Sequence, residues 1–135
     1  MNFAPGRQTG PVAKKLNNMA RLEAVALALP EAERVDIESW GDHPTFRVRG
    51  KNFVFCDQAA THLTVKLPSE EAAGLVASRE NAEPAGYGLG RSGWVALTLA
   101  ESLPAAEWAE VAEMVETSYR LVAPKTLVRR LDDPE

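Results

Sequence analysis

Cysteine and long apolar runs are almost absent from this chain of 135 residues. Cys56 is the single cysteine, so no disulfide can form within the chain, and a reducing compartment is expected. No apolar run approaches the roughly 18 residues that a membrane-spanning helix needs. Residues 1–18 lack the continuous apolar stretch of a secretory signal. We therefore expect a cytoplasmic protein that does not associate with a membrane.

Positive charge is not in excess either. Lys and Arg number 15 against 19 Asp and Glu, which gives a net charge of −4. This balance excludes a polycation of the histone type, but it leaves room for a local basic surface. Hydrophobic residues make up 45% of the chain and charged residues 25%, as in an ordinary globular protein, and the length suits one domain.

The groups that would build a catalytic centre are also scarce. The two histidines, His43 and His62, do not have the spacing of metal ligands. Cys56 and His62 flank a short turn and are candidates for a nucleophile–base pair, but no third residue is placed to orient them. Asp57, next to Cys56, would raise the pKa of the thiol rather than lower it. We expect a structural cysteine, and neither an enzyme nor a bound cofactor.

Two further patterns have a chemical and a structural interpretation. An acidic run offers oxygen ligands for a hard cation, but a solvated strand edge is the favoured interpretation, and we expect no metal site. The run comprises Glu31, Glu33, Asp36, Glu38 and Asp42. Residues 88–93 match the GxGxxG fingerprint of dinucleotide-binding proteins, yet a strand follows where the fingerprint requires a helix.

The spacing of apolar residues predicts an alternation of helices and strands. Three- and four-residue spacings indicate helices, and alternation with polar residues indicates half-buried strands. Helices are expected at residues 19–29, 69–77 and 104–123, with a short terminal turn at 125–131. Strands are expected at residues 33–40, 45–48, 53–56, 61–67 and 94–99, and a loop at 81–93.

This order predicts an α+β fold, a two-layer sandwich. Hairpin connections dominate the middle of the chain, so the sheet should be mostly antiparallel, with the helices packed on one face. Residues 1–18 are polar and contain Gly and Pro, which indicates a flexible N-terminal extension. Residues 19–131 are expected to form a single domain.

Basic residues concentrate in the strands of the predicted sheet. Period two places Arg47 and Arg49 on the same side of their strand, and Lys51 follows in the turn. Lys66 lies on the polar side of the strand at 61–67. If these sides coincide, one sheet face is basic and suited to phosphate contacts. An ordinary solvated sheet face is the alternative, and the acidic total charge favours it.

Five short motifs, in this order along the chain, resemble the MmcQ/YjbR family. They are WGxxPTFRV from Trp40, GKxF from Gly50, VKLP from Val65, GRxGWV from Gly90 and SYxLVxPK from Ser118. The resemblance covers about Met19 to Leu127. It implies a compact domain similar to the frataxin fold with two β-hairpin wings, a bacterial origin, and a DNA-binding label that is itself an analogy of fold.

The resemblance also suggests which residues would act. Trp94 and Tyr119 are expected to pack in the fold rather than to stack on bases. The side chains expected to contact phosphates are Arg47, Arg49, Lys51, Lys66, Arg91 and Lys125.

Three hypotheses for the function follow. The leading one is a small non-enzymatic binding protein that holds double-stranded DNA on its basic hairpin or sheet face by counterion release. The alternative is a protein-interaction or chaperone-like adaptor, which an exposed apolar patch or edge strand would favour. The third is a small-ligand or metal protein, as in frataxin-fold relatives, that uses the acidic run.

Overall fold

The computed structural model describes residues 17–38, 43–86 and 88–133. The helices are α1 (Asn18–Ala26), α2 (Ser69–Ser78), the short 3-10 helix η3 (Leu89–Ser92), α3 (Ala105–Val122) and α4 (Lys125–Asp132). The strands are β1 (Ala32–Ile37), β2 (His43–Val48), β3 (Lys51–Cys56), β4 (His62–Lys66), β5 (Ala82–Pro84) and β6 (Trp94–Thr98).

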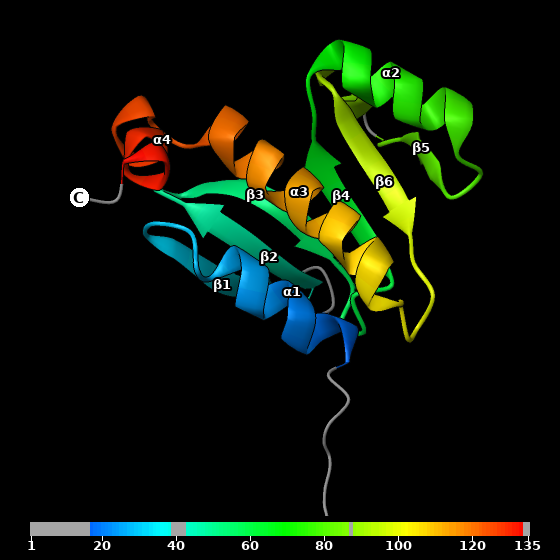
Figure 1. Ribbon diagram of the computed structural model, residues 1–135, viewed down its shortest axis with the longest axis horizontal. Helices are drawn as coiled ribbons and strands as arrows, with labels where there is room; N and C mark the ends of the chain where they lie inside the picture. The colour runs from blue at the N-terminus through cyan, green and yellow to red at the C-terminus, as the bar shows by residue number, and fades with distance from the viewer. Residues whose placement is uncertain (1–16, 39–42, 87, 134–135) are drawn as a thin grey trace, which may run out of the picture.

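The strands form one sheet, and the helices lie on one side of it. The strand order is β1-β2-β3-β4-β6-β5, and every neighbouring pair is antiparallel. Figure 1 shows α1 and α3 side by side across one face of the sheet, with α2 over the β6–β5 end. The predicted α+β fold with a mostly antiparallel sheet is therefore confirmed.

The core lies between α3 and the helix-facing side of the sheet. Val111, Val115 and Tyr119 of α3 are buried against it, and the Tyr119 ring meets Phe53 edge to face with 5.4 Å between ring centroids. The register of β2 and β3 shifts between Phe46 and Arg47, so both Phe53 and Val54 are buried. Tyr119 therefore packs in the core, as the sequence predicts.

Near this register shift, a buried serine forms hydrogen bonds with backbone groups that would otherwise be unpaired. Ser118 Oγ donates to the carbonyl oxygen of Phe53 at 2.6 Å and accepts from the amide of Lys66 at 2.9 Å. Since an unpaired buried backbone group is costly, this side chain ties α3 to two strands at once. It fixes β4, and with it the open side of the sheet, relative to the core.

The start of the fold lies slightly earlier than the sequence predicts. Asn17 Oδ1 accepts from the Ala20 amide at 2.7 Å and caps α1. Asn18 is buried and donates to the carbonyl oxygens of Ala60 (3.1 Å) and Ala100 (2.8 Å). These two asparagines belong to the folded unit, whereas residues 1–16 of the predicted extension lie outside the described residues.

Two other elements differ from the expected ones. Helix α1 ends at Ala26 instead of residue 29, because Pro30 cannot continue the helix and the Leu29 amide already bonds three residues back, to Ala26. The predicted loop at 81–93 contains β5 and η3. A three-residue strand ending in proline gives no alternation long enough to detect.

None of the described helices is both long and apolar enough to cross a membrane.

Candidate functional site

The face of the sheet away from the helices, which we call the open face, carries the candidate site. Thr45, Phe55, Thr64 and Ala96 are register partners in one row across β2, β3, β4 and β6. Side chains two residues along each strand share that face. The open face includes Glu33, Val35, His43, Thr45, Arg47, Phe55, His62, Thr64, Lys66, Glu83, Trp94, Ala96 and Thr98.

An aromatic pair lies at the centre of the open face. The rings of Phe55 and Trp94 meet edge to face, with centroids 5.5 Å apart and an angle of 67° between planes. Both side chains are half-buried. Lys66 is the register partner of Trp94, so the ammonium group and the indole leave adjacent strands on the same side. The sequence predicts only packing for Trp94, yet the structure leaves part of it accessible on this face.

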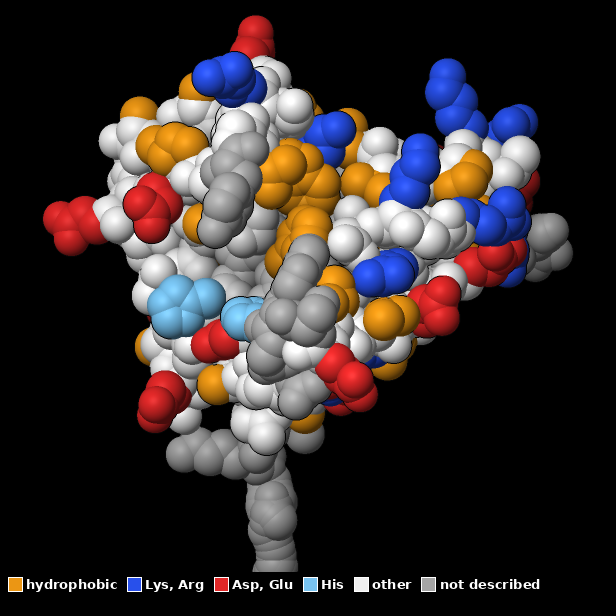
Figure 2. Space-filling model, turned by 180° about the vertical axis from the view of Figure 1, so that it is seen from behind, with side chains coloured by type: hydrophobic (Ala, Val, Ile, Leu, Met, Phe, Trp, Pro, Cys, Tyr) orange, Lys and Arg blue, Asp and Glu red, His pale blue; other side chains and the backbone are white. Residues whose placement is uncertain are grey.

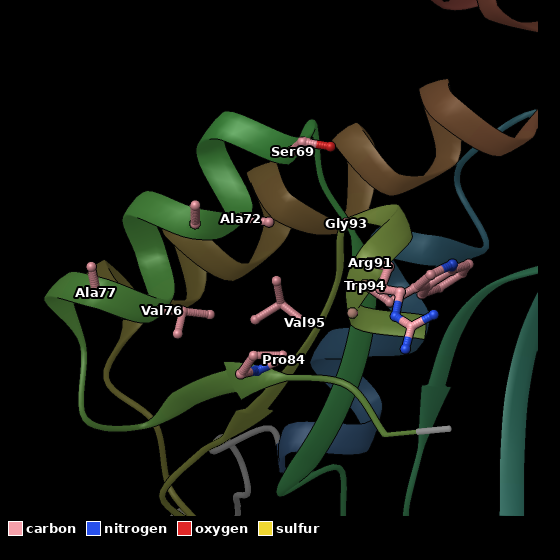
Figure 3. Close-up of a pocket in the computed structure, with 11 residues that line it drawn as sticks. Ser69, Ala72, Val76, Ala77, Pro84, Arg91, Gly93, Trp94 and Val95 are labelled. Carbon is pink, nitrogen blue, oxygen red and sulfur yellow. The ribbon is translucent and has the colours of Figure 1, made fainter. Parts of the chain in front are cut away.

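Helix η3 places Arg91 next to this pair. Gly93 ends η3 with φ +92° and accepts from the Leu67 amide at 2.9 Å. A Cβ atom on Gly93 would come within 2.1 Å of the Leu67 carbonyl oxygen, so this close approach requires glycine. Figure 3 shows the side chains of Arg91 and Trp94 extending to the same side, at one rim of the pocket of about 370 Å³ beneath α2, which both residues help to line.

The other predicted cations take different positions. Arg47 lies on the open face, where its Nε donates to Thr45 Oγ1 at 3.3 Å. Arg49 instead sits in the two-residue turn after β2, where both it and Gly50 have positive φ, so strand alternation does not reach it. Lys51 pairs with Val48, a core residue, and therefore lies toward the helix side of the sheet.

Arg49 is also neutralised. Its guanidinium donates to both carboxylate oxygens of Glu31, at 2.5 and 2.9 Å. Hydrogen bonding to Arg49 holds the pKa of Glu31 below its usual value, and the same contact raises the pKa of Arg49. Arg130 of α4 lies 3.5 Å from the same carboxylate, which brings α4 against the β2–β3 turn.

Helix α4 adds basic residues that the sequence reasoning missed. It begins at Lys125, one of the predicted contacts, and has Arg129 and Arg130 in its last turn. Figure 2, a view of the open face, shows Lys and Arg side chains gathering mainly over the half nearest α4, with the two histidines over the other half. The four-residue spacing of Lys125 and Arg129 in the sequence could have predicted this, because residues four apart lie on the same face of a helix.

Some cations form ion pairs with carboxylates, whereas those of the open face do not, and among the described residues neither do Arg21, Lys51, Lys125 and Arg129. Within the described ranges, carboxylates pair with Arg34, Arg49, Arg79, Arg120 and Arg130. Arg47, Lys66 and Arg91 have no such partner in that part of the chain. Glu33 is the register partner of Arg47, but the two side chains do not form an ion pair. The structure thus brings together three of the six predicted residues, with Arg49, Lys51 and Lys125 elsewhere.

A shallow pocket of about 300 Å³ opens at the histidine end of the open face. It is lined by His43, Pro44, Phe55, Cys56, Asp57, His62 and Thr64. Burial alone would raise the pKa of Asp57, but hydrogen bonds from Thr61 Oγ1 (2.6 Å) and the His62 amide (3.0 Å) outweigh it and hold that pKa well below its usual value. His62 Nδ1 lies 3.3 Å from the same carboxylate.

The chemistry of this pocket argues against a nucleophilic cysteine. Burial, followed by the charge of Asp57, raises the pKa of the Cys56 thiol to about 12. A thiol with that pKa is protonated at neutral pH and is a poor nucleophile. The ring of His62 faces Asp57, which orients the histidine without activating the cysteine. The structural role predicted for Cys56 agrees with this geometry.

The described members of the acidic run do not form a cation site. Asp36 pairs with Arg34 at 2.9 Å, and Glu31 is held by Arg49. Asp42 lies outside the described residues. Among the residues that the structure describes, no group of three or more His, Cys, Asp or Glu side chains is placed to hold a metal ion.

Comparisons with known proteins identify relatives of this fold. The family model YjbR matches residues 27–121. The crystal structure of DR2400, a Deinococcus radiodurans protein with a DUF419 domain, is similar with a TM-score of 0.62 and 23% sequence identity, over 82% of this chain and 81% of that chain. At this identity the likeness shows the fold alone. No curated protein matches the chain.

Proposed function

The chain belongs to the YjbR family, and we propose that it is a non-enzymatic DNA-binding protein that holds the phosphate backbone on its open face. The observation that carries the proposal is the set of three cations without carboxylate partners, Arg47, Lys66 and Arg91, on one side of the sheet. Each can replace a counterion on a phosphate, so binding would be driven by counterion release and would depend little on sequence.

The distribution of negative charge supports the same orientation. The outer surface of α3 carries Glu107, Glu110 and Glu113, all exposed. This surface lies on the helix side of the sheet, so the acidic layer that would repel DNA faces away from the open face. The net negative charge of the protein is therefore compatible with a basic open face.

Salt dependence tests the proposal directly. The probe is a fluorescently labelled 20-base-pair duplex with a 12-nucleotide single-stranded tail, followed by anisotropy between 50 and 200 mM salt. Three phosphate contacts predict a slope of log K against log salt of about −2.7, which is about a 40-fold loss of affinity over this range.

Charge-neutralising variants locate the interface. Replacing Arg47 and Lys66 by Gln should reduce the slope to about −0.9, because one of the three contacts remains. The matched control neutralises Arg79 and Arg120, which pair with carboxylates away from the open face, and changes the net charge equally. No binding at 50 mM salt, or an equal effect of both double variants, would overturn the proposal.

A protein-interaction role is the second candidate, because the open face is not purely basic. Val35, Phe55 and Trp94 give it a half-buried apolar centre, and β1 is an edge strand. If this candidate is correct, a protein partner stays bound at 500 mM salt while no DNA binds at 50 mM. Release of the partner by salt, together with DNA binding, would exclude it.

A further inference from the structure

We propose that the ligand of the open face is single-stranded nucleic acid, with a base stacked on the indole of Trp94. This inference rests on the proposed function and names its substrate class. It depends on the position of one aromatic residue between cations, and on the width of the sheet that carries it.

Trp94 has the surroundings of a base-stacking residue. Lys66 is its partner across the β4–β6 ladder, and Arg91 precedes it by three residues and extends to the same side. The edge-to-face contact with Phe55 occupies at most one face of the indole. Proteins that bind single strands without sequence preference combine such an aromatic face with cations that follow the backbone.

A second feature of the open face accepts a neighbouring base. The pocket of about 300 Å³ beside Phe55 has His43 and His62 among its lining residues. Its aromatic and imidazole rings offer flat surfaces and hydrogen-bonding nitrogens, which suit an unpaired base splayed away from its neighbours. Because Phe55 contacts Trp94 and lines this pocket, the two subsites are adjacent.

The width of the open face argues against a duplex as the preferred ligand. Arg47 lies on β2 and Trp94 on β6, three strand spacings apart, which is about 14 Å. The major groove of B-DNA is about 12 Å wide and admits a helix or a two-stranded ribbon, not a four-stranded surface. In a duplex the base faces are also covered by their neighbours, so the indole would have no base to stack on.

The test compares a single strand with a strand that lacks bases and with a duplex. Labelled dT12, a 12-nucleotide abasic strand with the same phosphates, and a blunt 20-base-pair duplex are titrated at 50 mM salt. The native protein should bind dT12 at least tenfold more tightly than either of the other two. The abasic strand reports on stacking without any change to the protein.

Variants of Trp94 give an independent readout. W94A should weaken dT12 binding at least tenfold and leave duplex binding within twofold, because stacking on one aromatic residue accounts for roughly a 5- to 150-fold change in affinity. W94F keeps an aromatic face and should stay within about threefold of the native protein. W108F makes the same exchange at a buried tryptophan of α3 and should change neither affinity.

The outcomes separate this inference from the proposed function. If dT12, the abasic strand and the duplex bind equally, and the R47Q/K66Q variant weakens all three, the open face binds phosphates without stacking and the inference is wrong. If none of the three binds at 50 mM salt, the proposed function itself is wrong. Tighter binding of dT12 that is unchanged in W94A would place the stacking residue elsewhere and would also overturn the inference.

Discussion

Asp57 is the residue at which a single ionised group contributes most clearly to the fold. Its carboxylate accepts hydrogen bonds from the Thr61 amide (2.8 Å), the Thr61 hydroxyl and the His62 amide, and so closes the turn between β3 and β4. Hydrogen bonds to a charged group contribute more to stability than those between neutral groups. This turn positions His62 at the edge of the open face.

We expect D57N to lower the free energy of unfolding by about 2 kcal/mol at pH 7, because the charge is lost and one of the two acceptor oxygens becomes an amide nitrogen, which cannot accept a hydrogen bond. The pKa of Asp57 is lowered by folding, so its contribution is complete above the unfolded-state pKa of about 3.9 and is lost as the pH falls further. Urea unfolding at pH 7, 5 and 3 should show the difference between native and variant shrinking only at the lowest pH.

D133N is the control for this change, because Asp133 is exposed and forms no ion pair with another described residue. Its unfolding should match that of the native protein at all three pH values. A difference between native and D57N that stays constant down to pH 3 would show that the carboxylate is not held ionised by these hydrogen bonds.

Cys56 should be unreactive in the folded protein. Its thiol is buried and its pKa is raised to about 12, so the thiolate is scarce at pH 8. We expect the folded protein to react with a disulfide reagent at least 100-fold more slowly than the protein in 6 M guanidinium chloride. Equal rates in the two states would mean that the thiol is accessible and reactive in the fold.

Among the elements, α2 and the end of η3 use glycine for different reasons. Gly74 lies inside α2 with open space around it, so G74A should raise the free energy of unfolding by about 0.5–1 kcal/mol. Gly93 has φ +92° and approaches the Leu67 carbonyl oxygen, so G93A should lower it by more than about 2 kcal/mol.

The G88A variant separates the cost of a positive φ from the cost of a steric clash, which are combined at Gly93. Gly88 also has positive φ, but a Cβ there would meet no neighbouring atom. This variant should therefore cost only the backbone strain, about 1 kcal/mol. Chemical unfolding of the three variants checks the order, and equal losses in G88A and G93A would mean that the close approach to Leu67 is unimportant.

Most elements were predictable from local pattern, and the exceptions have local causes. The strand at 61–67 alternates cleanly, and β4 does bury Leu63 and Val65 and leave His62, Thr64 and Lys66 on the other side. β5 was not predictable, because three residues ending in Pro84 become a strand only through pairing with β6. The hairpin turn after residue 48 was predictable from Gly50, but the expectation that Arg49 shares a strand face with Arg47 is wrong, because the positive φ at Arg49 and Gly50 interrupts the alternation.

At the scale of the whole molecule, the types of the candidate residues could be predicted but their arrangement could not. The sequence names Arg47, Lys66 and Arg91 as basic, yet only the ladder from β2 to β6 shows that the first two share a face. Trp94 was expected to pack because tryptophan usually does. Trp94 lies opposite Lys66 on a solvated face because β4 pairs with β6. The spacing of apolar residues along the chain does not reveal which strands pair.

Negative charge on the open face should weaken DNA binding. Glu33 lies across the ladder from Arg47 without pairing to it, and its carboxylate opposes any nearby phosphate. We expect E33Q to tighten DNA binding two- to fivefold at 50 mM salt, with the gain fading at 200 mM as screening increases. E113Q, on the outer surface of α3, makes the same charge change on the helix side and should have no effect.

Anisotropy titrations with the tailed duplex measure the DNA affinity of both variants, E33Q and E113Q. Weaker binding by E33Q, or an equal gain in both variants, would contradict the assignment of the DNA surface to the open face.

The alternation of side chains along the central strands of this sheet separates positions that hold the core from positions that meet solvent. Lys66 stands between Val65 and Leu67, and Phe55 between Val54 and Cys56, so each solvent-side position is flanked by residues that hold the core. Substitutions at Lys66 or Phe55 can therefore change the outer surface while the core residues beside them stay the same. Relatives with this same architecture are free to have acquired different ligands, and their outer positions, rather than their shared core, will record which ones.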